Sequence, residues 1–193
     1  LIVRAGAVVV LAVVGVTLLV DGGPHPEVVQ AAVAAPADAT AANDDATVVV
    51  PKRRQPTALV TVAATGDIAM GSTPNLPSDG GRSFFSGVQA DLAGDVVLGN
   101  LEGTLSVGGG SKCGPTSTNC FAFQTPPGYA RWLARAGFTT LNLANNHAYD
   151  FGASGLRQTI AALDRVGLRH TGRPGQVTIQ EVAGVKVATV GFA

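Results

Sequence analysis

The stretch "FTTLNLANNHAYDFG", residues 138–152, begins as an apolar strand and ends in a polar cluster. Thr140, Leu141 and Leu143 are residue types that suit a buried, pleated surface. Four polar side chains follow directly: Asn145, Asn146, His147 and Asp150. A strand that stays apolar and then ends in amide, imidazole and carboxylate groups indicates a functional edge.

The segments around this stretch alternate between strand and helix patterns. Strands are predicted at 57–65, 95–100 and 138–144, with two more around a turn at Ala183-Gly184, and helices at 83–94, 125–137 and 153–166. In the helix at 125–137, Thr125 is expected to cap the start and Gly137 to end it. This alternation predicts an α/β fold with a largely parallel sheet covered on both faces.

Each of the three parallel strands is followed by polar residues. The carboxyl ends of such strands line one edge of the sheet, where ligands bind. The residues expected to meet there are Asp67, Asn100, Glu102, Asn146 and His147. Their ligand types suit a divalent metal such as Mn, Zn, Fe or Mg, which polarises a substrate oxygen or activates a bound water. The chain contains no GxSxG, P-loop or GxGxxG motif.

Taken singly, these motifs have ordinary structural explanations. A Gly-Asp pair after a strand is usually a turn or a helix cap. Asn145 and Asn146 are turn residues that tolerate left-handed backbone, and His147 can be a partly buried hydrogen-bonding residue. Only the joint placement of three motifs at three strand ends favours a site.

Composition excludes some classes of partner. The chain has 193 residues with 13 Lys and Arg and 13 Asp and Glu, so its formal net charge is zero. This balance of charges does not indicate a polyanion-binding surface, and nucleic acid is not an expected partner. The two cysteines, Cys113 and Cys120, are expected to form a disulfide that closes a surface loop, with a two-cysteine metal site as the alternative.

The first 56 residues differ from the rest in composition. Arg4 precedes an uncharged, mostly apolar run at 5–20, which predicts that residues 1–20 are a signal peptide or an N-terminal membrane anchor. The alternative is a buried helix or strand of the main domain. Residues 21–56 are rich in Ala, Asp, Pro and Thr and predict a disordered linker. The protein is thus expected to be exported, and either membrane-anchored or extracellular.

Four stretches together resemble the CapA family of capsule-synthesis proteins associated with poly-γ-glutamate. They are "TGDIAMG", "VVLGNLEGTLS", the run from "FAFQTPPGYARWLARAG" through "LANNHAYDFG" to "DRVGL", and "GVKVATVGFA". The resemblance covers roughly residues 57–193. It implies a calcineurin-like metallophosphoesterase fold, an α/β/β/α sandwich of two sheets flanked by helices. It also implies that residues 57–193 are the N-terminal part of that domain, with further histidine-bearing loops beyond.

The resemblance also implies roles for single residues. Asp67 is similar to the first metal ligand, Asn100 and Glu102 to the bridging-ligand motif, and Asn146 to the amide ligand of a Gly-Asn-His motif. His147 corresponds to the residue near the leaving group, and Asp150 is placed to orient it. The first motif departs from ordinary phosphoesterases, because no histidine stands two positions after Asp67.

Three functions follow from this resemblance as expectations. The first is an exported capsule or poly-γ-glutamate biosynthesis protein with a metal-dependent, hydrolase-type site. The second keeps the fold without catalysis, as a cell-surface component that holds the anionic polymer or its synthase. The third is a generic metallophosphoesterase. Fold alone does not decide among them.

Overall fold

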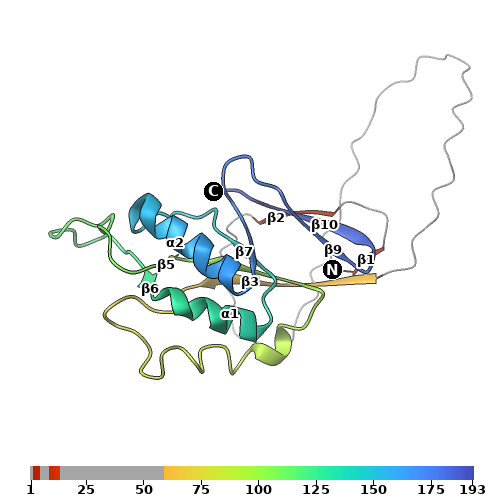
Figure 1. The fold of residues 1–193 in the computed structure, drawn as a ribbon, viewed down its shortest axis with the longest axis horizontal. Coiled ribbons are helices and arrows are strands. Elements are labelled where there is room, and N and C mark those ends of the chain that lie inside the picture. Colours follow the sequence, from red (N-terminus) through yellow and green to blue (C-terminus); the bar gives the residue numbers. More distant parts are fainter. Residues whose placement is uncertain (1, 5–8, 14–58) are drawn as a thin grey trace, which may run out of the picture.

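The computed structural model describes residues 2–4, 9–13 and 59–193, and Figure 1 shows its ribbon. The linker expected at 21–56 and most of the apolar segment at 1–20 lie outside these ranges. Two short pieces of that segment, β1 (Ile2–Arg4) and β2 (Val9–Val13), pair with strands of the main domain. Among the described residues, no helix has the length and apolar character that a membrane span requires.

A five-stranded sheet forms the centre of the molecule, with the order β1-β3-β4-β7-β8. Its other strands are β3 (Leu59–Ile68), β4 (Val96–Leu101), β7 (Thr140–Asn142) and β8 (Arg169–Thr171). The pairs β3–β4, β4–β7 and β7–β8 are parallel, which confirms the predicted parallel sheet. Every residue of β4 is buried, because this strand lies between two neighbours with layers on both faces.

The first strand differs from its prediction in length and burial. It was expected to be buried and to end at Gly66-Asp67, but β3 runs on to Ile68, and much of it is exposed or half-buried. A register shift between Ala64 and Asp67 allows the continuation, since such an irregularity re-aims the residues that follow it. Asp67 is thereby placed opposite Asn100 of β4.

Two helices cover one face of the central sheet, α1 (Ala130–Ala136) and α2 (Gly152–Arg165) (Figure 1). The α1 side chains at Trp132, Leu133 and Ala136 enter the larger apolar core, and Gly137 ends the helix with φ 105°, as predicted. The predicted cap at Thr125 is wrong. That residue belongs to strand β6 (Gln124–Thr125), and the helix starts instead through a short 3₁₀ turn, η2 (Pro127–Tyr129).

The helix predicted at 83–94 is also wrong. Only a 3₁₀ turn, η1 (Gln89–Asp91), forms there, after a series of tight turns. Asp79 accepts hydrogen bonds from the backbone N–H groups of Gly81 and Ser83 and from the Ser83 hydroxyl. Such local bonds favour turns over a helix.

A second sheet, β2-β10-β9, packs on the opposite face. The hairpin β9 (Thr178–Val182) and β10 (Val185–Gly191) turns at Ala183-Gly184, as predicted, where both residues have positive φ. Its side chains Val185 and Val187 form a second core with Val60, Val96 and Leu98 of the central sheet. The described residues thus form helix, sheet and sheet layers, a mixed α/β fold that matches three layers of the expected sandwich.

Candidate functional site at the carboxyl edge of the central sheet

The polar side chains at the carboxyl ends of β3 and β4 meet, as the parallel topology predicts. The Nδ2 group of Asn100 donates to Oδ1 of Asp67 at 2.7 Å and to Oε2 of Glu102 at 2.8 Å. Asn100 is buried, Glu102 is half-buried and Asp67 is exposed. One amide therefore joins two carboxylates at the edge of the sheet.

Two further amides determine which way Asn100 points. Oδ1 of Asn142 accepts from the backbone N–H of Ala144, so its Nδ2 faces Asn100 Oδ1 at 2.9 Å. Oδ1 of Asn145 likewise accepts from the N–H of His147, and its Nδ2 donates to Asn100 Oδ1 at 3.0 Å. The backbone donors fix which side-chain atom is oxygen and which is nitrogen in both Asn142 and Asn145. The Asn100 oxygen must therefore face their NH₂ groups, and its own NH₂ must face the carboxylates.

The imidazole of His147 lies beside this pair of carboxylates. Its Nδ1 is 2.9 Å from Oδ2 of Asp150, and its Nε2 is 3.6 Å from Oε1 of Glu102. The Asp150 side chain is fully buried, with an exposed fraction of 0%. A buried carboxylate on Nδ1 holds the ring and its tautomer, which leaves Nε2 as the nitrogen that faces the site.

Lys112 supplies a positive charge next to Asp150. Its Nζ is 2.6 Å from Asp150 Oδ1, outside hydrogen-bonding angles, so the contact is an ion pair. The same ammonium donates to the carbonyl of Asn146 at 3.0 Å and lies 3.4 Å from Nδ1 of His147. The buried charge of Asp150 is therefore paired on both sides.

The loop that carries Lys112 is closed by the predicted disulfide, Cys113–Cys120. It connects β5 (Thr104–Leu105) with β6, which pair in parallel. Both ends of the loop contact Asp150, since the N–H of Lys112 donates to its carbonyl and the N–H of Phe123 to its Oδ2. The Phe123 ring packs on the His147 ring with centroids 4.6 Å apart. The disulfide loop thus forms one wall of the site.

The pKa of the Glu102 carboxyl group depends on its burial and on the neighbouring charges. Burial raises the pKa of Glu102 first, and the negative charge of Asp67 raises it further. The charge of His147 and the hydrogen bond from Asn100 oppose this rise. Glu102 is therefore a carboxyl group that takes up a proton more readily than a free one.

The fit of this cluster to a divalent cation is partial. The Asp67 and Glu102 carboxylates have the donor chemistry of a metal site. However, the Asn100 oxygen is engaged by two amides. No group of three or more His, Cys, Asp or Glu side chains within the described ranges is placed to hold an ion. These residues alone do not complete a metal shell.

The structure brings together five of the residues singled out from the sequence: Asp67, Asn100, Glu102, His147 and Asp150. Asn146 is exposed, and its carbonyl rather than its side chain takes part, through Lys112. Sequence reasoning missed Asn142 and Lys112 and treated Asn145 as a turn residue. A polar residue within an apolar strand was a usable signal for Asn142, whereas nothing in the sequence pointed to Lys112.

Comparison with known proteins decides the family. The model of the family described as "Bacterial capsule synthesis protein PGA_cap" matches residues 61–193, which is most of the chain and all of the site. The chain belongs to this family. The PGA_cap match confirms the resemblance drawn from the motifs.

Two PGA_cap relatives come from Bacillus species. The "PGA biosynthesis protein CapA" of Bacillus subtilis (strain 168) is 31% identical over 144 residues, which is 69% of this chain and 37% of that protein. The "Capsule biosynthesis protein CapA" of Bacillus anthracis is 44% identical over 66 residues, 31% of this chain and 16% of that protein. The chain therefore spans well under half the length of either relative.

Proposed function

We propose that this chain is part of a capsule-synthesis protein that acts in poly-γ-glutamate biosynthesis through a hydrolase-type site at the carboxyl edge of the central sheet. Membership of the PGA_cap family and the names of the two Bacillus relatives support the biological role. One observation supports the chemistry. The His147 ring is held by buried Asp150, with Nε2 directed to the carboxylate of Glu102.

Each residue of the cluster has a separate task in this proposal. Asp150 holds the His147 ring, and His147 moves a proton at Nε2 to or from the reacting group. Asn100 holds Asp67 and Glu102 in place through its two N–H bonds. Lys112 forms an ion pair with the buried Asp150 carboxylate behind the imidazole.

A divalent cation, Mn, Zn, Fe or Mg, is a further part of the proposal for the whole protein. Asp67 and Glu102 are the described residues that would hold it, and the metal would polarise a substrate oxygen. Elemental analysis of the full-length protein and of an Asp67→Ala and Glu102→Ala variant tests this. Bound metal is expected only without the substitutions, together with a higher melting temperature. Equally low metal in both proteins contradicts it.

Complementation of a strain that lacks its own capsule-synthesis protein tests the catalytic role. His147→Ala and Asp150→Asn are expected to abolish polymer formation at unchanged protein level, since a ring without its carboxylate loses tautomer and orientation. Arg157→Gln serves as the matched control, because this exposed side chain of α2 is not part of the cluster. Full rescue by His147→Ala rejects catalysis at this site.

A second function on the same fold is a non-catalytic component that holds the anionic polymer or its synthase. The hydrogen bonding of Asn100 favours it, because each of the two carboxylates already accepts a hydrogen bond from this protein amide. Rescue by a variant that lacks Asp67, Asn100 and His147 together supports this function. Loss of polymer with the same variant, correctly folded and exported, supports catalysis.

Export to the cell surface is also a proposal. It is supported by Arg4 before the apolar run at 5–20 and by the disulfide, which persists mainly in oxidising compartments. Cell fractionation of the full-length protein, with and without residues 1–20, tests it. Retention of the complete protein in the cytoplasmic fraction contradicts export, and membrane anchorage is read from the same fractions.

A further inference from the structure

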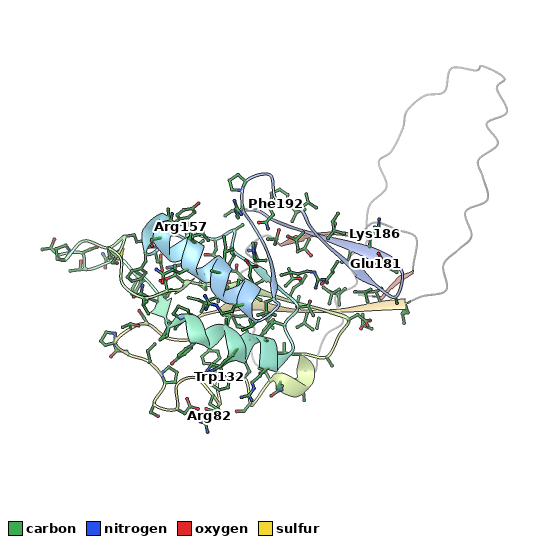
Figure 2. All side chains as sticks on the ribbon, viewed as in Figure 1. Arg82, Trp132, Arg157, Glu181, Lys186 and Phe192 are labelled. Carbon is green, nitrogen blue, oxygen red and sulfur yellow. A yellow bond between two sulfur atoms is a disulfide. The ribbon has the colours of Figure 1, made fainter. Side chains whose placement is uncertain are left out.

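A groove of about 370 Å³ lies beside α1, away from the strand-edge cluster. Its lining includes Arg82, Phe85, Gln89, Trp132 and Arg135. Figure 2 shows Arg82 and Trp132 on the same side of the molecule, with Arg157 on another side. The turns before β4 supply one wall, and the Gln89 side chain donates to the carbonyl of Arg135 at 2.9 Å. This bond ties that wall to the helix.

Trp132 orders two arginines, Arg135 in the lining of the groove and Arg131, which precedes Trp132 in the chain. The Arg131 guanidinium carbon lies 4.3 Å from the indole centroid, and that of Arg135 lies 5.3 Å away. The indole itself is 7% exposed, and its N–H donates to the carbonyl of Gly80 at 2.8 Å. A cation–π contact orients a guanidinium and leaves its N–H groups free to bind an anion.

The positive charge of the groove has no internal partner. Among the residues that the structure describes, Arg82, Arg131 and Arg135 are exposed and form no ion pair with a carboxylate. The acidic residue nearest to Arg82 in sequence, Asp79, is occupied by Gly81 and Ser83. Arg82 and Arg135 therefore line the groove with exposed guanidinium groups, and Arg131 adds a third exposed guanidinium against Trp132.

We propose that this groove binds carboxylates of the anionic polymer whose synthesis the protein serves, an inference that rests on the proposed function. An arginine fork matches a carboxylate with two parallel hydrogen bonds, and three such forks engage successive carboxylates of one chain. The zero net charge of the protein makes this a local site rather than a general polyanion surface.

The groove lies at a different edge of the central sheet from the cluster that is proposed to carry out the reaction. In a parallel α/β unit the helix runs opposite to the strands, so Arg135 at the end of α1 lies toward the edge where the strands begin. The cluster of His147 and Glu102 lies where the strands end. A polymer bound in the groove is thus held at a distance from the reacting edge.

Binding of labelled poly-γ-glutamate of defined length to the full-length protein, followed by fluorescence anisotropy, tests the proposal. Replacing Arg82, Arg131 and Arg135 by Gln is expected to weaken binding at least about tenfold. A matched control replaces three exposed arginines elsewhere, Arg157, Arg165 and Arg173, by Gln and is expected to change the affinity less than about twofold. Both proteins must keep the circular dichroism spectrum of the starting protein.

The second variant set replaces the same three groove arginines by Lys, which keeps the charge and removes the fork. Intermediate affinity and steep weakening with salt are expected. Equal loss in the groove and control variants, no polymer binding by the unaltered protein, or tighter binding of duplex DNA than of the polymer overturns the proposal.

The same assay separates this inference from the proposed function. His147→Ala is expected to bind the polymer as tightly as the unaltered protein. Normal binding by the groove variant together with failed complementation by His147→Ala rejects the groove and leaves the function standing. Groove-dependent binding together with full rescue by His147→Ala supports the groove and rejects the chemistry.

Discussion

Asn100 is a candidate metal ligand from the sequence, and in the fold its amide contacts four other side chains. Its oxygen accepts from Asn142 and Asn145, and its NH₂ donates to Asp67 and Glu102. Three of these four contacts join side chains from separate segments, and the fourth is to Glu102, two residues after Asn100. The Asn100 amide therefore links Asn142 of β7 to the two carboxylates through hydrogen bonds.

Replacement of Asn142 tests this chain of amides. Asn142→Leu removes one donor to the buried Asn100 oxygen and is expected to lower the free energy of unfolding by about 1–3 kcal/mol. Asn146→Ala, at an exposed position, is expected to stay within about 0.5 kcal/mol. Urea unfolding of both variants measures the difference, and equal losses contradict the role given to Asn142.

Asp95 provides a residue-scale prediction of pH dependence. The backbone N–H and the hydroxyl of Thr61 both donate to its Oδ2 and hold the pKa of its carboxyl below the usual value. A lowered folded-state pKa means that the stabilisation is present above the unfolded pKa of about 3.9 and is lost as the pH falls through the folded value.

The Asp95→Ala variant is therefore expected to have a lower melting temperature than the unaltered protein at neutral pH. This difference in melting temperature, the gap, is expected to disappear in acid. Thermal melts from about pH 7 down to the acid limit of folding measure the gap, starting well above the unfolded pKa. Asp91→Ala, at another exposed acid, is the control. A gap that is constant over the whole pH range contradicts the assignment.

At the scale of elements, the disulfide loop and the turn that carries His147 depend on one another. Lys112 stands next to Cys113, and both ends of the loop meet Asp150. The sequence suggested the disulfide from spacing alone. It carried no sign that the loop closes over the histidine, because that contact joins segments far apart in the chain.

Removal of the disulfide is expected to lower the free energy of unfolding and to reduce the contribution that Lys112 makes to it. Cys113→Ser with Cys120→Ser should lower the free energy of unfolding by about 2–3 kcal/mol, the value for a short closed loop. Lys112→Met should cost about 1–3 kcal/mol with the disulfide present and less without it, since the loop then no longer positions the ammonium. Denaturant unfolding of the four proteins measures this coupling, and strict additivity contradicts it.

At the scale of the whole molecule, two apolar cores hold the three layers together. The larger core joins the helices to the central sheet, and the smaller one joins the two sheets through Val60, Val96, Leu98, Val185 and Val187. The smaller core lies on the opposite face of the sheet from the helices. It therefore determines whether β10 stays in place behind the strands that carry the site.

Val187→Ala tests the contribution of the smaller core. The side chain is 2% exposed, and its truncation is expected to lower the free energy of unfolding by about 2 kcal/mol through lost burial and a residual cavity. Val177→Ala, at a side chain that is 56% exposed, is expected to change little. Equal effects in a denaturant titration contradict the assigned packing of the two sheets.

The sequence alone determined the parallel α/β class, the succession of the main strands along the chain, the end of α1 at Gly137 and the disulfide. These features depend on local periodicity, end signals and cysteine spacing, which act over a few residues. The convergence of Asp67, Asn100 and His147 also followed from sequence, since parallel strands place their carboxyl ends on one edge. The cap predicted at Thr125 failed because that residue pairs in strand β6, whereas the helix predicted at 83–94 is replaced by turns with local hydrogen bonds.

Only the tertiary structure decided how the amides of Asn142 and Asn145 orient Asn100, and that Lys112 pairs with Asp150. It alone placed Arg131 and Arg135 against Trp132 and brought Arg82 into the lining of the same groove. The physical reason is common to all three. Hydrogen bonds, ion pairs and cation–π contacts depend on distances of a few ångströms between segments, and those distances exist only once the layers have packed.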